Sequence, residues 1–359
     1  MPKKKVFRAI GLMSGTSLDG IDVAYLESNG LSLSLLGGWA TYPYSKSFRK
    51  QLRRINSDRS NQNEIEMELT ELHYRAVQEF LNSKKLNPEE IDLIGFHGHT
   101  IEHNPEKSRS VQIGDGELLA RKLNITVFNN FRSNDIRHGG QGAPLAPIFH
   151  SKLAAQFERP LAVLNIGGVA NVTWIGGHEE ELWAFDTGPG NALIDDWVMQ
   201  HGAGEYDVDG AIAARGSVNF EVLEGLLNHE YFNQNPPKSL DRNEFFMGLR
   251  EDFSLEDGAA TLGRFTAETV RLSQKHFPRP VTRWIVCGGG QHNKFILSEL
   301  RNNLDQPVLV ADDVGWHGDA IEAQAFAYLA IRSSLGLPIS FPNTTGVSTP
   351  LTGGIRHDP

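Results

Sequence analysis

The sequence predicts an α/β protein made of two similar halves. The chain has 359 residues, which is more than one hydrophobic core usually serves, and 40% of them are hydrophobic, as in ordinary globular proteins. The same succession of strand and helix patterns occurs twice along it. A net charge of -10, from 34 basic and 44 acidic residues, argues against a nucleic-acid partner and against an anionic membrane surface.

The first half opens with three runs of strand character that follow one another closely. The first run is apolar and the second alternates apolar with other residues, so a hairpin is expected between them. Helical periodicity and further short strands come next. The predicted strands are 6–12, 21–27, 31–42, 91–96, 109–113 and 125–129, and the predicted helices are 45–57 and 63–84.

The second half repeats the opening hairpins and then alternates helices with strands. Three antiparallel strands followed by strand and helix alternation, present twice, predict paired ribonuclease-H-like domains that face a central cleft. We place the first domain at 1–133, completed by 340–359, and the second at 134–339. The predicted strands are 161–166, 169–175, 182–185, 281–287 and 307–311, and the predicted helices are 190–202, 207–214, 217–229, 241–250, 255–276, 292–302 and 319–334.

The turn of the first hairpin, Gly11 to Asp22, has the composition of a phosphate-binding loop. Glycines allow positive φ and leave space for a ligand, and hydroxyl side chains and turn amides can converge on an anion. Asp19 and Asp22 could hold a magnesium ion through water. The alternative is a glycine-rich hairpin that only turns the chain.

Two further glycine-rich turns of the second half are expected to meet at the same nucleotide. Gly167-Gly168 joins the hairpin strands 161–166 and 169–175, and Gly288-Gly289-Gly290 ends strand 281–287 before a helix. Such a turn leaves room for a base or ribose and directs a helix N-terminus toward phosphates. The triple glycine alone could equally serve packing.

Two carboxylates are candidates for chemistry. Asp186 ends a strand before a glycine-rich bend, which gives a general base a rigid platform and open space; the alternative is a helix-capping carboxylate. Glu322 shares a helical stripe with Phe326 and Leu329. A carboxylate there is either a buried structural acceptor or a ligand of sugar hydroxyls.

Two other groups allow more than one interpretation. His97 and His99 could hold zinc in a hydrolase, but a third ligand of clear spacing is missing, so hydrogen bonding to a polar ligand is preferred. Arg132 could clamp a carboxylate with two hydrogen bonds, or form a salt bridge with Asp135.

Together these segments resemble the anhydro-N-acetylmuramic acid kinase family of the actin, sugar kinase and heat-shock ATPase superfamily. Two positions depart from the usual family pattern: His99 stands where glutamine is usual, and Asn130 where aspartate is usual. The resemblance runs nearly end to end, through Gly11 to Asp22, His97-Gly98, Gln112 to Asp115, Phe131-Arg132 with Asp135, Gly139 to Pro144, Asn165 to Asn171, Phe185 to Asn191, Gly288 to Gly290 with His292-Asn293, and Glu322 with Gln324 to Phe326.

The resemblance implies an actin-like ATPase fold and a kinase that uses ATP and Mg²⁺. The expected reaction converts 1,6-anhydro-N-acetylmuramic acid, ATP and water into N-acetylmuramic acid 6-phosphate and ADP, a step of peptidoglycan recycling. Asp186 would be the base, and His97, Arg132 and Glu322 would bind the sugar. The ATP-binding residues would be Gly15, Thr16, Ser17, Leu18, Asp19, Gly20, Ile21, Asp22, Gly167, Gly168, Gly288, Gly289 and Gly290.

Three other functions stay open at this point: another amino-sugar kinase of the superfamily, a metal-dependent hydrolase using His97 and His99, and a sugar-sensing regulator. The expected partners are small molecules, with a homodimer left open. The single cysteine, Cys287, lies in an apolar run typical of a buried thiol. Without a membrane span or a clear signal peptide, we expect a cytoplasmic protein.

Overall fold

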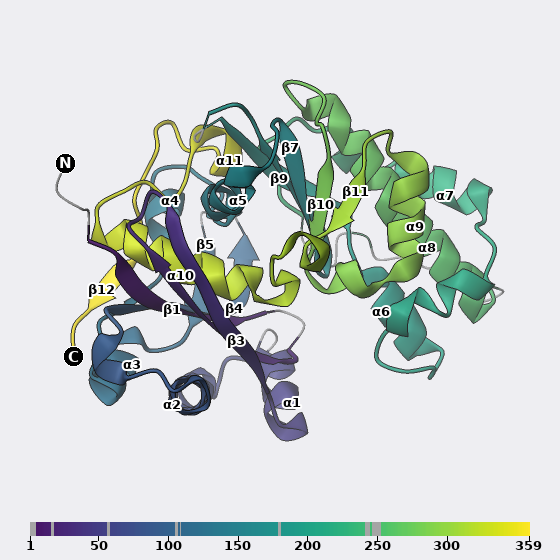
Figure 1. Cartoon of the computed structure of the whole chain (residues 1–359). Coiled ribbons are helices and arrows are strands. Elements are labelled where there is room, and N and C mark those ends of the chain that lie inside the picture. Colours follow the sequence, from purple (N-terminus) through teal and green to yellow (C-terminus); the bar gives the residue numbers. More distant parts are fainter. Residues whose placement is uncertain are drawn as a thin grey trace. The chain divides into compact units, whose positions relative to one another are not determined.

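A computed structural model describes residues 5–15, 18–55, 58–104, 107, 109–178, 181–240, 245 and 253–359. The chain divides into two compact units, each described here by itself (Figure 1). Unit 1 comprises Met1–Ala155 and Ala320–Pro359, and unit 2 comprises Gln156–Asp319. Within the described residues, no helix is both long enough and apolar enough to cross a membrane.

Unit 1 is built on a mixed sheet with the strand order β12-β6-β4-β1-β2-β3, and β5 pairs with β4. β1 and β3 are antiparallel to β2, whereas β4 is parallel to β1 and β6 is parallel to β4. The strands are β1 (Phe7–Ser14), β2 (Gly20–Ser28), β3 (Leu33–Pro43), β4 (Leu93–Asn104), β5 (Arg109–Ile113), β6 (Val127–Asn129) and β12 (Ile355–His357).

Helices cover both faces of this sheet. The α10 helix packs against β1 and β4 at two glycines, because a Cβ on Gly11 would lie 1.7 Å from the Ala323 carbonyl oxygen and one on Gly95 would lie 2.0 Å from the Phe326 carbonyl oxygen. The other face carries the main core, formed with α1, α2 and α3. The helices are α1 (Lys46–Ile55), α2 (Gln62–Lys84), α3 (Gly116–Leu123), α4 (Ser133–Arg137), α5 (Pro147–Leu153), α10 (Ile321–Ser334) and α11 (Pro342–Thr345).

Unit 2 repeats the same sheet order, β11-β10-β7-β8-β9. Its first three strands are antiparallel neighbours, and β10 and β11 continue the sheet in parallel. The strands are β7 (Leu161–Ile166), β8 (Val169–Ile175), β9 (Leu182–Pro189), β10 (Trp284–Cys287) and β11 (Val308–Val310). The predicted α/β class with two ribonuclease-H-like strand orders is therefore confirmed, while the cleft between the units stays a prediction.

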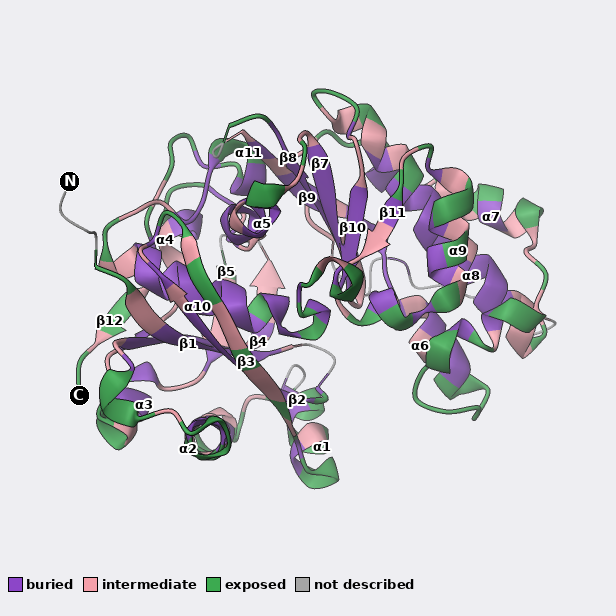
Figure 2. Cartoon of the chain, viewed as in Figure 1, coloured by how far each residue is buried: buried purple, intermediate pink, exposed green. Residues whose placement is uncertain are grey.

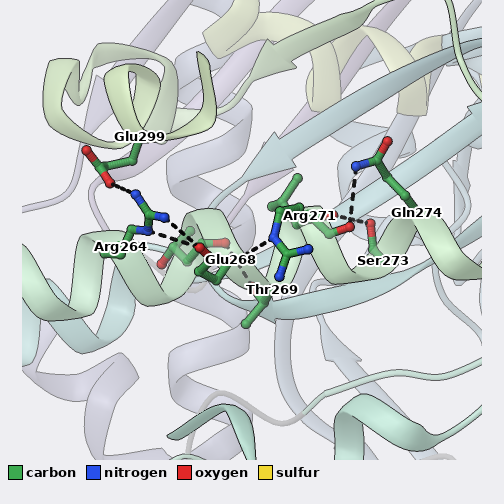
Figure 3. Close-up of polar contacts among 9 residues, drawn as sticks. Arg264, Glu268, Thr269, Arg271, Ser273, Gln274 and Glu299 are labelled. Atoms are coloured by element: carbon green, nitrogen blue, oxygen red, sulfur yellow. Dashed lines mark hydrogen bonds and ion pairs between the residues drawn. The ribbon is translucent and has the colours of Figure 1, made fainter. Parts of the chain in front are cut away.

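The longest helix described in unit 2 is α8, which contacts both β9 and α9. One side of α8 packs on the end of β9, where the Thr266 hydroxyl donates to the Gly190 carbonyl oxygen over 3.1 Å. Another side carries the ion pairs of Figure 3, which link Arg264 to Glu268 and to Glu299 of α9. The helices are α6 (Ala192–Gln200), α7 (Phe220–Leu227), α8 (Leu255–Ser273) and α9 (Lys294–Asn303).

Short 3-10 helices connect these elements. Figure 2 shows the central strands buried, with exposed residues on the outer turns of the helices. The 3-10 segments are Pro88–Glu90, Ala154–Gln156, Val208–Gly210, Ala213–Arg215, Glu230–Asn233, Gln274–His276, Gly289–His292, Asp312–Val314 and Gly318–Ala320.

The predicted helix 207–214 is wrong, because two 3-10 turns occupy this segment. Asp209 has a φ of 59°, which interrupts helical geometry, and the Asp207 carboxylate accepts the backbone N–H groups of Ile212 and Ala213. Apart from Phe245, the predicted helix 241–250 lies outside the described residues.

The compact units divide at different places from the expected domains. The boundaries fall after Ala155 and Asp319, rather than after residues 133 and 339. The physical reason is packing: α10 lies on β1, β2 and β4 of the first sheet, and α5 contacts α10. Unit 1 therefore includes the helix that the sequence assigned to the second domain.

Candidate active site

The predicted phosphate loop is the turn between β1 and β2. Its described residues fold back on themselves, since the Leu18 N–H donates to the Gly15 carbonyl oxygen over 3.2 Å and Leu18 has a φ of 60°. The Tyr44 N–H donates to the Asp19 carbonyl oxygen over 3.0 Å, which fixes the far side of the turn. Thr16 and Ser17, also predicted here, lie outside the described residues.

Three buried polar side chains support the first strand where it enters this turn. The Tyr44 hydroxyl donates to Ser14 Oγ over 2.7 Å, and Ser14 Oγ lies 3.2 Å from His99 Nδ1. Burial lowers the pKa of His99 to about 4, so its ring is neutral at physiological pH. His99, which departs from the usual family residue, thus contacts the loop rather than solvent.

Asp19 and Asp22 both act electrostatically on Tyr44. After burial, their two negative charges are among the causes that raise the pKa of the Tyr44 hydroxyl. Asp22 Oδ1 accepts a hydrogen bond from the Thr41 hydroxyl over 2.5 Å. Two carboxylates with solvent access fit Mg²⁺, which usually keeps several waters and takes its other ligands from phosphates. No group of three potential metal-ligating side chains occurs in the described ranges.

The structure brings His97, Arg132 and Glu322 together in unit 1. The Arg132 guanidinium donates to His97 Nε2 over 2.9 Å and to the Gly142 carbonyl oxygen over 2.8 Å. A guanidinium has five N–H donors, so these two hydrogen bonds leave further donors unused, and the buried Nε has no partner among the described residues. Burial lowers the pKa of Arg132 to about 10, while Glu322 opposes that shift electrostatically.

His97 holds Arg132 in place. His97 Nδ1 lies 2.9 Å from the Gly98 carbonyl oxygen, which only a protonated Nδ1 can satisfy, so Nε2 is the acceptor for Arg132. Burial and then the Arg132 charge lower the pKa of His97 well below its usual value. Both ring nitrogens are engaged, and this argues against the alternative of a zinc site built on His97 and His99.

Asp135 does not form the salt bridge that was the alternative role for Arg132. Its carboxylate accepts the Gly142 N–H over 2.6 Å and the Thr345 hydroxyl, and so ties the 139–142 loop to the C-terminal segment. Arg132 approaches the same loop at the Gly142 carbonyl. The crossing loop therefore holds Arg132 through a backbone hydrogen bond, and the Asp135 charge acts on Arg132 only electrostatically, raising its pKa.

Glu322 lies at the start of α10 and is exposed, unlike its predicted stripe partners Phe326 and Leu329, which are buried. Its carboxylate accepts no hydrogen bond from any residue in the described ranges. Desolvation by the surrounding protein raises the pKa of Glu322, the positive charge of Arg132 lowers it, and the negative charge of Asp19 raises it. An acceptor without a protein donor favours the ligand interpretation over that of a structural acceptor.

The two predicted glycine turns of unit 2 lie beside each other. Gly288 follows β10 with a φ of 75°, and a Cβ on it would lie 2.2 Å from the Asn165 side-chain oxygen of β7. The Asn191 N–H, before α6, donates to the Gly167 carbonyl oxygen over 2.8 Å. Space around Gly167, Gly168 and Gly289 is open, because a Cβ on each would meet nothing closer than 3.6 Å. This open backbone suits close approach by a ligand.

Asp186 lies near the end of β9, opposite Asn171 of β8 beside a register shift. Its Oδ2 accepts the Leu240 N–H over 2.8 Å, whereas no donor to Oδ1 occurs in the described ranges. Burial raises the pKa of Asp186 to about 7, against the lowering effects of the Leu240 N–H and the Lys238 charge. Its partner is a loop amide, so the alternative of a helix cap does not apply.

Two residues near Asp186, Tyr231 and Lys238, were not identified from the sequence. The Tyr231 hydroxyl donates to the Asp186 carbonyl oxygen over 2.6 Å, and the Lys238 carbonyl oxygen accepts the Asp186 N–H over 3.1 Å. Lys238 follows two prolines in a polar stretch, and such a lysine is ordinarily a solvent-exposed loop residue. No local pattern signals its burial.

Comparison with known proteins gives matches over nearly the full chain. The family described as "Anhydro-N-acetylmuramic acid kinase" matches residues 7–357. Relatives of that name include one from Paramagnetospirillum magneticum, 49% identical and covering 98% of this chain and 99% of its own, and one from Methylobacterium nodulans, 50% identical, with 98% and 100% covered. Among solved structures, component A of (R)-2-hydroxyglutaryl-CoA dehydratase from Acidaminococcus fermentans is 11% identical with a TM-score of 0.47, with 90% of this chain and 99% of that chain covered. The sequence matches confirm the predicted resemblance.

Proposed function

Because this chain belongs to the anhydro-N-acetylmuramic acid kinase family, we propose that it couples two reactions on one sugar. Water opens the 1,6-anhydro ring of 1,6-anhydro-N-acetylmuramic acid, and the released O6 takes the γ-phosphoryl group of ATP. The products are N-acetylmuramic acid 6-phosphate and ADP. The name that its relatives carry and the arrangement of the candidate residues within each unit support this reaction.

Asp186 is the proposed general base. Its Oδ1 takes a proton from water as the water oxygen bonds to C1 and the C1–O6 bond breaks. O6 then bonds to the γ-phosphorus as the bond to the bridging oxygen of ADP breaks. A carboxyl with a pKa of about 7 and one unengaged oxygen suits this work, because an efficient base titrates near the operating pH.

The phosphate side of the reaction is assigned to backbone amides and two carboxylates. The described part of Gly15–Asp22 and the open glycines Gly167, Gly168 and Gly289 support ATP binding by close backbone approach. Asp19 and Asp22 would hold Mg²⁺, which when bound supplies positive charge to the phosphates. Tyr44 and Ser14 keep the loop in position.

The sugar side is assigned to Arg132, His97 and Glu322. Arg132 meets the lactyl carboxylate, a group that ordinary hexoses lack, through the donor capacity that His97 and Gly142 leave unused. Glu322 accepts hydrogen bonds from sugar hydroxyls. His97 keeps the guanidinium oriented.

The observation that carries this function is Asp186 itself, a carboxyl within β9 whose Oδ2 accepts the Leu240 N–H, whereas its Oδ1 accepts no hydrogen bond from the described residues. The test follows the oxygen atom of water into the product. In heavy-oxygen water the product should carry the label at C1, with initial inversion there, and the phosphate ester oxygen should come from the sugar. Unlabelled C1 under conditions that prevent later exchange would refute ring opening by water and favour an ordinary amino-sugar kinase.

A second assay tests the ATP site. Asp19→Ala should raise the KM for ATP with Mg²⁺ about tenfold or more, as expected from losing a charged contact, with thermal stability close to wild type. Asp58→Ala, which removes an exposed carboxylate engaged with Ser60, is the matched control. Equal ATP dependence in both variants would exclude Asp19 from the site.

We further propose a cytoplasmic enzyme with small-molecule partners. Use of ATP and the buried thiol of Cys287, the single cysteine of the chain, support this location. The protein partner we would test is a second copy of this chain, by sedimentation of the purified protein.

A further inference from the structure

A lysine lies buried beside the proposed base. Lys238 is only 6% exposed, and its Nζ makes one described hydrogen bond, to the Tyr231 carbonyl oxygen over 3.1 Å. The ammonium lies 4.4 Å from the centre of the Tyr231 ring and 6.0 Å from that of Phe185. Aromatic faces offset part of the cost of burying a cation. Lysines are almost never fully buried unless they are paired, so the burial of Lys238 without an ion-pair partner among the described residues is unusual.

The chain around Lys238 is attached to Asp186 at three points. The Asp186 N–H donates to the Lys238 carbonyl oxygen, the Leu240 N–H donates to the Asp186 carboxylate, and the Tyr231 hydroxyl donates to the Asp186 carbonyl oxygen. These bonds hold the lysine and the aspartate in one rigid unit. The side chains themselves form no hydrogen bond or ion pair with each other.

We propose that Lys238 is a positioning residue that sets the proton affinity of Asp186, its buried cation keeping the carboxylate ionised without occupying the oxygen that takes the proton. This inference rests on the proposed role of Asp186 as base. A direct salt bridge would block that oxygen, and no cation at all would leave the buried carboxyl protonated. The observed arrangement avoids both.

The electrostatics around the pair agree with this role. Lys238 lowers the pKa of Asp186, whereas burial raises it to about 7; burial lowers the pKa of Lys238 to about 8, and Asp186 raises it. Burial, with Lys238 and Lys275, lowers the pKa of His276 to about 4, so His276 is neutral where Asp186 titrates. The charged side chains Arg264, Glu268 and Arg271 of α8 form their own network (Figure 3).

The test is the pH profile of kcat/KM in two neutral variants. Lys238→Met removes the charge and the donor, whereas Lys238→Gln removes the charge but keeps a donor for Tyr231. In both variants, the acidic limb of the kcat/KM profile should move to higher pH by about one unit. This is the lower end of the pKa shifts that an opposite charge at close distance causes. Activity near pH 9 should approach that of wild type, because Asp186 is then ionised without help. Lys238→Arg keeps the positive charge, so the acidic limb of its kcat/KM profile should lie at the same pH as in wild type.

A matched control separates this effect from a general change of surface charge. Lys275 is exposed and acts on Lys238 and His276. Lys275→Met should leave the acidic limb within about 0.2 units of wild type, as screened exposed charges do. Loss of activity at every pH in both neutral variants, with no shift of the limb, would show that Lys238 is merely structural.

Direct titration distinguishes failure of this inference from failure of the proposed base. Carboxyl-labelled aspartate resonances of the full chain, with Asp186 assigned by its loss in Asp186→Asn, report its protonation without turnover. An unchanged Asp186 titration in Lys238→Gln overturns the inference about Lys238. A shifted titration together with full activity of Asp186→Asn would sustain it while removing Asp186 as the base.

Discussion

Unit 2 holds two groups of charged side chains, one on α8 and α9 and the other around β9, and they are organised in opposite ways. In the first group, Arg264 donates to Glu268 from two nitrogens over 3.1 and 2.7 Å and to Glu299 over 2.6 Å, and Arg271 donates to the second oxygen of Glu268 over 2.6 Å (Figure 3). In the second group, Asp186 and Lys238 each make one side-chain hydrogen bond with the described residues, and both bonds are to the backbone.

The pKa shifts follow this difference. Burial would raise the pKa of Glu268, yet its arginine partners lower it; burial would lower the pKa of Arg264, yet its glutamate partners raise it. For Asp186 and Lys238 burial prevails, raising the pKa of the acid to about 7 and lowering that of the base to about 8. Full pairing makes charges inert, whereas incomplete pairing leaves them able to exchange protons near neutral pH.

The largest expected effect is on catalysis. Asp186→Asn should lower turnover by about two to four orders of magnitude, the usual range for a lost general base, with ATP binding retained. Asparagine keeps the shape and the acceptor for Leu240 but cannot take a proton. Steady-state kinetics and nucleotide titration measure the two quantities. Residual activity within a few-fold of wild type would move the base elsewhere, with Glu322 the next residue to replace.

The opposite result is expected for the paired network. Glu268→Gln should lower the free energy of unfolding by about 2 kcal/mol, between the values for exposed and buried ion pairs, and leave kcat unchanged. One amide oxygen cannot satisfy both Arg264 and Arg271. Denaturant unfolding and kinetics under the same conditions provide the measurements.

The control for the network is an exposed pair of the same sequence spacing. Glu117 and Arg121 lie 3.5 Å apart with side chains 64% and 58% exposed. Glu117→Gln should change stability by less than about 0.5 kcal/mol. Equal losses in the Glu268 and Glu117 variants would mean that completeness of pairing does not distinguish the network from the surface.

A smaller effect is expected on the stability of the Asp186 region. Its pKa rises from 3.8 to about 7 on folding, so the stability present below pH 4 is lost as the pH rises toward 7. Asp186→Asn escapes this loss and should therefore gain on the order of 1 kcal/mol over wild type at pH 8, and nothing at pH 3.5. Thermal unfolding at both pH values measures the gain; an asparagine variant less stable at pH 8 would contradict it.

Much of the fold and part of the site follow from local sequence pattern. The strands of both hairpins are specified by adjacent residues that alternate or run apolar, and their turns by glycine, so the antiparallel orders β1-β2-β3 and β7-β8-β9 could be predicted, whereas the edge strand β12 was missed. The strand that carries Asp186 could also be predicted, although β9 continues to Pro189, beyond the predicted end at residue 185, and the role of Asp186 as base stays a prediction. The prediction of a helix at 207–214 was wrong because the Asp207 carboxylate accepts the backbone N–H groups that would donate within a continuous helix.

Only the tertiary structure decided which side chains meet. Lys238 is buried in a segment that is bonded to β9 far away in the sequence, since its carbonyl oxygen accepts the Asp186 N–H and the Leu240 N–H donates to the Asp186 carboxylate. No local sequence pattern predicts these contacts. His97 faces Arg132 rather than a metal because β4 and the chain after β6 bring them within 2.9 Å. The α10 helix joins unit 1 because Gly11 and Gly95 let it approach the sheet closely. Local pattern fixes backbone conformation, whereas burial and pairing of charges depend on distant segments that only folding brings together.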